Sequence, residues 1–398
     1  MCVIDVLSII GRSSQLFEDD LSRLESETKS QVSDSTFLVL GGGGSIGRSV
    51  VKELFKHAPR VLHVVDLSEN SLAELVRDVR SELDWLGGDF KTFTLDIGST
   101  IYDQFIEDSF SYDYVLNLSA LKHVRSEKDP YTLMRMLDTN IFNTVKTLRQ
   151  SQERSSKKYF CVSTDKAANP VNLMGGSKKI MELYALSSRV ELPVCSARFA
   201  NVAFSAGSLL DGFKERINKN QPIVVPQGIQ RFFVTEQEAG QLCVLSCLFG
   251  DDGDIFFPKP SPKLQLQDFF GIAERFVAQL GFEPAYFSDV AEAREAARHA
   301  NTHKRWPVIT QVSDTTGEKP YEEFFTKNET LDFDTFHTIG VVKRGVAQND
   351  PPFHEFEQAI KDLRDSGKFT KTAILNAMKI MLPELEHDEK FKNLDEKM

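Results

Sequence analysis

The sequence has no apolar run long enough to cross a membrane and no excess of basic residues. Its longest apolar stretches, 3–10 and 242–249, are far shorter than the ~20 residues of a transmembrane helix. The first stretch contains Asp5 and no early lysine or arginine, which argues against a signal peptide. The net charge of −11 is not that of a nucleic-acid-binding protein. We therefore expect a cytoplasmic protein with no membrane span and no nucleic-acid partner.

Cysteine is scarce, and the few cysteines are scattered. The five cysteines are Cys2, Cys161, Cys195, Cys243 and Cys247. Cys243 and Cys247 are four residues apart in an apolar, helix-like stretch, but no histidine or carboxylate pair lies nearby at metal-ligand spacing. We expect buried core thiols and no metal site.

Strand-like and helix-like patterns alternate from residue 36 to about residue 205. Short apolar runs of the length of buried strands lie at 37–40, 61–65, 91–95, 114–118, 159–163 and 194–199. Amphipathic helical patterns separate them. This alternation predicts an α/β fold with a doubly wound parallel sheet of the Rossmann type.

The first of these strands leads into a glycine-rich loop. Gly41, Gly44 and Gly47 recur at every third position, immediately before an amphipathic helix. Glycines there let the backbone turn tightly and approach a pyrophosphate, to which the helix N-terminus offers amide donors. Asp66 ends the next strand, where a carboxylate binds the adenosine ribose and repels a 2′-phosphate, so we expect NAD as the cofactor. The other residues expected at the cofactor are Ser45, Ile46, Asp96, Ile97 and Ala120.

Five further segments carry a resemblance to a known family. They are Asn-Leu-Ser-Ala-Leu-Lys-His-Val at 117–124, Ser-Thr-Asp-Lys-Ala-Ala-Asn-Pro at 163–170, Met-Gly-Gly-Ser-Lys at 174–178, Arg-Phe-Ala-Asn-Val at 198–202 and Gly-Glu-Lys at 317–319. In order and spacing the chain resembles the nucleotide-sugar 4,6-dehydratases that act on N-acetylglucosamine nucleotides. These enzymes form the CapD-like polysaccharide-biosynthesis group of the extended short-chain dehydrogenases/reductases.

The resemblance implies the 4,6-dehydration of a nucleotide-activated N-acetylhexosamine, most simply UDP-N-acetylglucosamine. The 4-keto-6-deoxy product would serve bacterial surface-glycan synthesis, and NAD would be regenerated in each turnover. Asp165 would protonate the leaving C6 hydroxyl, Lys166 would remove the C5 proton and Thr164 would contact O4. Mutual attraction would shift the pKa of an acidic Asp165 and of a basic Lys166 the wrong way for these roles. We therefore expect the geometry to keep the two from forming a tight ion pair.

The chain departs from its superfamily at one catalytic position. The usual Tyr-x-x-x-Lys pair is here Met174 and Lys178, and a thioether neither gives nor takes a proton. Lys178 is implied to bind the nicotinamide ribose. The C4 hydroxyl proton must leave by another route, either through Thr164 with a water or through the cofactor ribose with Lys178.

The resemblance also implies contacts to the substrate. These residues are Lys122, His123, Asn201, Arg231, Glu318 and Lys319. Arg231 resembles the arginine that grips the diphosphate, for which a bidentate guanidinium is suited. A surface salt bridge is the alternative for Arg231, a structural hydrogen bond for His123, and a structural ion pair is expected for Arg198. Thr315 and Thr316 stand where relatives have Arg-Pro, so the nucleotide base is left unassigned.

The predicted organisation has four parts. An N-terminal helical extension (1–35) precedes an NAD-binding domain with the catalytic residues (36–205). A substrate-binding lobe interleaved with the core (206–345) and a C-terminal helical extension (346–398) follow. Because relatives associate through helices beside the active site, we expect a homo-oligomer. The alternatives are a nucleotide-sugar 4-epimerase, which normally uses the missing tyrosine, and a non-catalytic NAD-binding regulatory protein, which has no need of an Asp-Lys pair.

Overall fold

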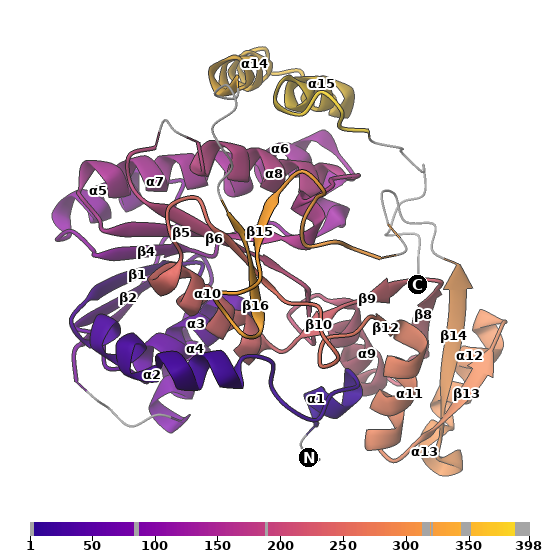
Figure 1. The fold of residues 1–398 in the computed structure, drawn as a ribbon. Coiled ribbons are helices and arrows are strands. Elements are labelled where there is room, and N and C mark those ends of the chain that lie inside the picture. Colours follow the sequence, from indigo (N-terminus) through magenta and orange to yellow (C-terminus); the bar gives the residue numbers. More distant parts are fainter. Residues whose placement is uncertain are drawn as a thin grey trace.

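The computed structural model describes residues 4–82, 87–187, 190–312, 319, 321–343 and 352–386, and every structural statement refers to these. Its largest element is a nine-stranded sheet (Figure 1). The strands are β1 Thr36–Leu40, β2 Val61–Asp66, β3 Asp89–Thr94, β4 Tyr114–Asn117, β5 Lys158–Thr164, β6 Val194–Phe199, β11 Ile255–Pro258, β15 Thr330–Asp332 and β16 Ile339–Lys343.

The order of the strands is that of a dinucleotide-binding sheet. Across the sheet they run β15-β16-β11-β6-β5-β4-β1-β2-β3. Every pair from β3 to β11 is parallel, whereas β16 is antiparallel to both β11 and β15. The 3-2-1-4-5-6 order is the doubly wound Rossmann arrangement. The predicted fold class is therefore confirmed.

Helices cover both faces of this sheet (Figure 1). One face carries α2 Glu18–Ser33, α3 Ser45–Phe55, α4 Glu69–Glu82 and α10 Glu236–Phe249; the other carries α5 Thr100–Asp108, α6 Pro130–Leu137, α7 Asn143–Glu153 and α8 Leu173–Ala185. Successive side chains of a strand point to opposite faces, so Val39 packs into the first layer and Leu38 into the second. Burial on both faces explains why β1 reads as a continuous apolar run.

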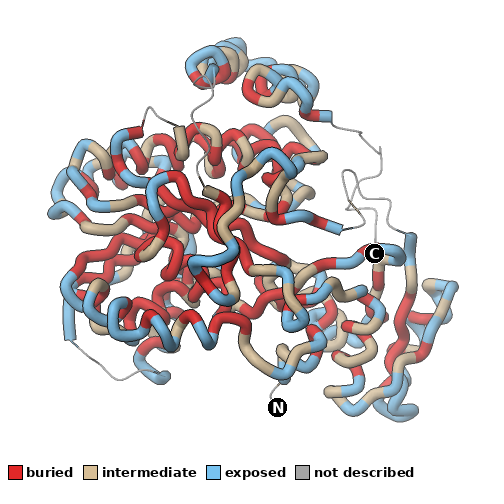
Figure 2. Tube along the Cα trace, in the orientation of Figure 1, coloured by how far each residue is buried: buried red, intermediate tan, exposed pale blue. Residues whose placement is uncertain are grey.

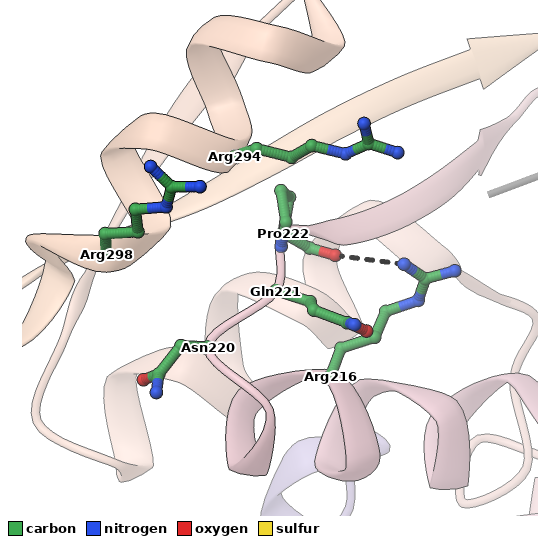
Figure 3. Close-up of a pocket in the computed structure, with 6 residues that line it drawn as sticks. All are labelled: Arg216, Asn220, Gln221, Pro222, Arg294 and Arg298. Carbon is green, nitrogen blue, oxygen red and sulfur yellow. Dashed lines mark hydrogen bonds between the residues drawn. The ribbon is translucent and has the colours of Figure 1, made fainter.

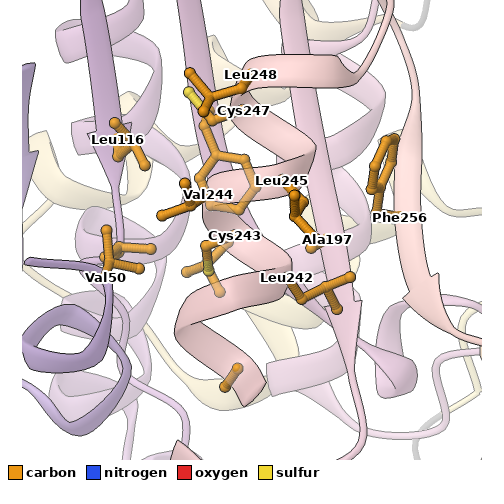
Figure 4. Packing of buried hydrophobic residues seen from close by; sticks show 14 of the residues in the cluster. Val50, Leu116, Ala197, Leu242, Cys243, Val244, Leu245, Cys247, Leu248 and Phe256 are labelled. Carbon is orange, nitrogen blue, oxygen red and sulfur yellow. The ribbon is translucent and has the colours of Figure 1, made fainter. Parts of the chain in front are cut away.

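Helix α10 is apolar on nearly all sides and is correspondingly buried. It packs against α3 and against strands β5, β6 and β11 of the sheet, and Figure 4 shows Cys243 and Cys247 among the aliphatic side chains of this core. Both thiols are buried, as predicted, and burial raises the pKa of each. A helix of this composition has no face suited to water. Figure 2 shows the same concentration of buried residues along the central strands.

A smaller lobe lies beside the carboxyl ends of β6 and β11. Its sheet joins β13 Glu283–Phe287, β14 Arg305–Val312 and β8 Ile223–Gln227 in parallel, in that order. The lobe's helices are α1 Val6–Ile9, α9 Leu209–Asn218, α11 Phe269–Gln279, α12 Val290–Arg298 and α13 Ala300–His303. Two short ladders connect the lobe to the core, β7 Asn201–Val202 with β10 Phe233–Val234, and β9 Gln230–Arg231 with β12 Gln267–Asp268.

The terminal segments pack against the folded core. Near the N-terminus, α1 contributes to the lobe, whereas α2 packs on α10, and Arg12 lies 2.6 Å from the buried carboxylate of Glu238. Near the C-terminus, α14 Phe353–Asp365 and α15 Lys371–Met381 form a pair over α6 and α8 (Figure 1). None of the helices in the described ranges is long and apolar enough to span a bilayer.

Candidate functional site

The glycine loop between β1 and α3 has the geometry of a pyrophosphate cradle. Gly41 has φ +75°, a left-handed conformation that favours glycine, and a β-carbon there would lie 2.7 Å from the amide nitrogen of Ser119. A β-carbon on Gly47 would lie 2.2 Å from the carbonyl oxygen of Gly41. Gly44 is the N-cap of α3, so the amides of Ser45 and Ile46 begin the helix without intrahelical acceptors. The loop thus presents free donors to an anion at a close distance.

Asp66 lies next to this cradle, as predicted. Its carboxylate accepts hydrogen bonds from the Gly43 amide at 2.9 Å and the Ser68 amide at 2.8 Å, and the side chain remains partly exposed. These two bonds fix the orientation of the carboxylate while leaving lone pairs for ribose hydroxyls. Among the other expected cofactor residues, Ile97 is buried, Ala120 is half-buried after β4, and Asp96 accepts from the Gly98 amide at 2.8 Å.

Thr164, Asp165 and Lys166 lie at the carboxyl edge of the sheet, where β5 ends. Thr164 is the last residue of β5, and the other two begin the short 3-10 helix η3 Asp165–Ala167. The Thr164 hydroxyl donates to Asp165 Oδ1 at 2.9 Å, and the Lys166 amide donates to the same oxygen at 2.8 Å. Asp165 is buried, while Thr164 and Lys166 are half-buried. The three side chains therefore form one connected polar group at the edge where ligands of such sheets bind.

The expectation that Asp165 and Lys166 avoid a tight ion pair is wrong for this structure. Lys166 Nζ lies 3.1 Å from Asp165 Oδ1. The physical reason is that η3 turns both side chains to the same side, and a half-buried ammonium lowers its desolvation cost by approaching a carboxylate. In this structure the two side chains thus form an ion pair.

Lys178 and Met174 lie on the side of α8 that faces the protein interior rather than solvent. Both are buried, and Lys178 Nζ donates to the Val162 carbonyl at 3.0 Å. Burial lowers the pKa of Lys178 to about 8. Next to it, Ser177 accepts a hydrogen bond at 2.9 Å from Asn140, a buried residue of the π-helical turn η2 Asp138–Phe142. The sequence analysis missed Asn140, because a π-helical turn, which often marks a functional position, has no simple sequence pattern.

Lys122 and His123 contact the loop at 205–207. Lys122 Nζ donates to the Ser205 hydroxyl at 3.2 Å, and a β-carbon on Gly207 would lie 2.9 Å from His123 Nε2. Both side chains are exposed, yet neighbouring protein atoms remove enough water to lower the pKa of each. The same loop reaches the cofactor cradle, since the Ala206 amide donates to Ser45 at 3.1 Å.

Strand β9 places Arg231 near the polar group at the end of β5. Its guanidinium is buried and donates to the carbonyl of Lys319 at 3.0 Å. Lys319 in turn donates from Nζ to the Asn169 carbonyl at 2.5 Å. Glu318, Thr315 and Thr316 lie outside the described residues. The structure thus joins the end of the Gly-Glu-Lys segment to the loop that follows Lys166.

Asn201 and Arg198 end up in different environments although they are close in sequence. Asn201 is half-buried in the β7–β10 ladder. Arg198 is fully buried and pairs with Glu182 and Glu329, each at 2.7 Å. The expected structural ion pair of Arg198 is therefore confirmed.

Glu322 is a second residue that the sequence analysis missed. Its carboxylate is buried, with Oε1 3.9 Å from Lys166 Nζ and 3.8 Å from Arg231 Nη2. Desolvation raises the pKa of Glu322. The only sequence signal was its place three residues after the Gly-Glu-Lys motif.

A separate cavity of about 460 Å³ lies in the smaller lobe (Figure 3). Arg216, near the end of α9, faces Arg294 and Arg298 of α12 across it, and residues 220–222 complete the lining. None of the predicted catalytic or cofactor residues lines this cavity. The candidate site is therefore identified by the glycine cradle and the carboxyl edge of β5, where the chemically matched groups lie.

The sheet order and the glycine cradle define a Rossmann-type dinucleotide-binding fold with a polar group at the carboxyl edge of β5. The chain belongs to the family described as polysaccharide biosynthesis proteins, whose model matches residues 37–344.

Three relatives illustrate the range of this family. A protein of Methanocaldococcus jannaschii, described as an uncharacterized membrane protein, is 29% identical over 78% of this chain and 86% of its own length. The capsular polysaccharide biosynthesis protein CapD of Staphylococcus aureus is 26% identical over 82% of this chain and 50% of its own. The probable polysaccharide biosynthesis protein EpsC of Bacillus subtilis is 26% identical over 85% and 54%. The chain thus spans about half the length of CapD and EpsC.

Solved structures share the fold. Pen from Bacillus thuringiensis has a TM-score of 0.62 at 23% identity, covering 80% of this chain and 90% of that one. A double mutant of DesIV, a dTDP-glucose 4,6-dehydratase of Streptomyces venezuelae with NAD bound, has a TM-score of 0.56 at 16% identity, covering 72% and 87%. At these identities the likeness establishes the architecture.

Proposed function

We propose that this protein is an NAD-dependent 4,6-dehydratase of a nucleotide-activated N-acetylhexosamine, with UDP-N-acetylglucosamine as the substrate. The observation that carries the proposal is the connected group of Thr164, Asp165 and Lys166 at the carboxyl edge of β5. An elimination across C5 and C6 needs both an acid and a base next to the sugar. The relatives active in polysaccharide biosynthesis support a role in surface-glycan synthesis.

The residues present fit an NAD molecule. Gly41, Gly44 and Gly47 make room for the pyrophosphate, the first turn of α3 supplies its amide donors, and Asp66 is oriented for the adenosine ribose. NAD-bound neighbours of the same fold, such as DesIV, are consistent with this cofactor. When bound, NAD would supply the hydride acceptor for C4 and the hydride donor for C6.

The proton released from the C4 hydroxyl needs an acceptor, since Met174 replaces the tyrosine. The hydrogen bond from Thr164 Oγ1 to Asp165 Oδ1 supplies a route: Thr164 takes the O4 proton as it passes its own to Asp165. Asp165, now neutral, then gives that proton to the leaving C6 hydroxyl, while Lys166 takes the C5 proton and later returns it. The alternative route runs through the cofactor ribose and Lys178. Because the buried Lys178 ammonium already donates to the Val162 carbonyl, we favour the route through Thr164.

The direct test is to incubate the protein with NAD and UDP-N-acetylglucosamine and to record mass and proton spectra. Loss of one water from the sugar supports dehydration. An unchanged mass with an inverted C4 would instead establish the 4-epimerase, and no change with several nucleotide sugars would favour the regulatory protein. Lys166→Ala should abolish turnover and still bind NAD, whereas Lys327→Ala, on an exposed loop, should leave turnover unchanged.

The homo-oligomer stays a prediction. The face of α6 and α8 beside the site is covered by α14 and α15 of the same chain. An oligomer would therefore use another surface, which light scattering of the full chain can measure.

A further inference from the structure

Glu322 lies between two cations that come from different parts of the chain. Its Oε1 is 3.9 Å from the ammonium of Lys166, on η3, and 3.8 Å from the guanidinium of Arg231, on β9. The side chain is only 5% exposed. Both distances exceed a hydrogen bond, so the carboxylate is attracted by two charges without being fully satisfied by either.

This placement favours the protonated form of Glu322. Desolvation raises the pKa of Glu322, and the neighbouring charge of Asp165 raises it further. The cations that face it, Lys166, Arg231 and Lys319, act in the opposite direction. Withdrawal of any of these cations would shift the balance towards the protonated form.

The proposed dehydration leaves a proton on Lys166 unaccounted for. Lys166 must be neutral to remove the C5 proton, yet the structure places its ammonium beside Asp165. Asp165 is not free to accept that proton, because it receives the O4 proton through Thr164 and delivers it to O6. A second carboxyl group is needed, and among the residues that the structure describes Glu322 is the one within reach.

We propose that Glu322 activates Lys166 by taking the ammonium proton when the diphosphate of the sugar nucleotide engages Arg231. An N–H bond of Lys166 breaks, an O–H bond forms on Glu322, and no other reactant is required. The anionic diphosphate draws the Arg231 guanidinium away from Glu322, and the bound sugar excludes water; both changes favour the neutral pair. Rotation of the flexible lysine chain closes the 3.9 Å gap to the ~2.9 Å of a hydrogen bond. Product release reverses the transfer. This inference rests on the proposed function.

The test is the pH dependence of kcat in Glu322→Gln. In the wild type the proton moves within the Lys166–Glu322 pair, so kcat should be nearly level around neutral pH. In Glu322→Gln, Lys166 must lose its proton to solvent. We expect kcat at pH 7 to fall about 10- to 100-fold and to recover about tenfold per pH unit towards alkaline pH, with KM changed less than about threefold. A single-turnover measurement should show NADH absorbance accumulating in the variant, because C4 oxidation precedes the step that is slowed.

Two variants serve as controls. Glu323→Gln removes the neighbouring, exposed carboxylate, which accepts a hydrogen bond from Asn169, and should keep the wild-type profile. Glu322→Asp keeps a carboxyl group and should retain a level profile at reduced kcat, which also tests the inference if the glutamine variant does not fold. A glutamine variant with the wild-type profile, an equal loss at every pH or a higher kcat would overturn it. If the wild type releases no water from the sugar, the proposed function fails instead, and the two failures are distinct.

Discussion

A β-carbon on Gly175 would lie 2.6 Å from the carbonyl oxygen of Lys166. The first turn of α8 and the turn η3 therefore approach each other closely, and a side chain at position 175 would force one of them to move. The position of Lys166 is thus set by packing against α8.

Gly175→Ala should accordingly displace η3. Overpacking of this kind costs about 1–3 kcal/mol of the free energy of unfolding, and a shift of the acid and base should lower kcat by about 100-fold. Urea unfolding and steady-state kinetics measure the two effects. The matched control is Gly212→Ala, in α9, where a β-carbon meets nothing within 4 Å. It should stabilise slightly, by about 0.5–1 kcal/mol, and leave kcat unchanged. Wild-type kcat in Gly175→Ala would show that η3 is held by other contacts.

Asp66→Asn should weaken the binding of NAD. The variant keeps the size of the side chain but loses the charge that attracts ribose hydroxyls and repels a 2′-phosphate. Charge-assisted hydrogen bonds contribute about 1.5–3 kcal/mol, so the Kd for NAD should rise by about 10- to 100-fold, and the preference over NADP should shrink. Calorimetric titration with both nucleotides measures this. Asp78→Asn on α4, whose carboxylate pairs with Lys52, should bind NAD normally. An unchanged Kd in Asp66→Asn would place the adenosine ribose elsewhere.

Lys178 should give the protein a stability that increases with pH. Burial lowers its pKa to about 8 in the folded protein, against ~10.4 for an exposed lysine. Between these values the unfolded chain binds the proton and the folded protein does not, so this group adds stability as pH rises from 8 towards 10. We expect wild type to gain up to about 3 kcal/mol relative to Lys178→Met over that window, as measured by urea unfolding. For Lys379→Met, at an exposed position, the difference in free energy of unfolding from wild type should not change with pH. A pH-independent difference for Lys178→Met would contradict the prediction.

Met378 on α15 should stabilise helix α8 by packing against it. It is fully buried, and its Cε would lie 3.0 Å from a β-carbon on Gly176 of α8. Met378→Ala removes this packing and should cost about 2–5 kcal/mol of the free energy of unfolding. Lys379→Ala, the exposed neighbour, should cost less than about 0.5 kcal/mol. Equal unfolding midpoints for the two variants would mean that the pair of C-terminal helices contributes little to the stability of α8.

Much of the fold could be predicted because its signals are local. The strand β1 is an uninterrupted apolar run, and the glycines that follow it serve a turn that is complete within seven residues of sequence. The alternation of such strands with amphipathic helices leaves the parallel sheet as the only way to bury both faces. The antiparallel strand β16 escaped this reasoning, since its partner β11 lies far away in the chain, and β15 joins the sheet only through β16.

The candidate site was predictable in its parts and not in its electrostatics. The residues 164–166 were found from their sequence, yet the ion pair between Asp165 and Lys166 was expected to be absent. Glu322 was missed because nothing in its local sequence distinguishes it from the exposed Glu323. Its importance comes from burial beside Lys166 and Arg231, which are more than ninety residues away in the chain.

Some features of this protein thus follow from the local sequence, and others only from the tertiary structure. The order of residues determined the strands, the glycine loop and the adjacent Asp165 and Lys166 at the end of β5, since these depend on neighbours along the chain. The folded arrangement fixed which charges meet, how much water reaches them and which helices support them. Those quantities depend on distances between remote segments, and a side chain's charge state follows its surroundings more than its position in the sequence.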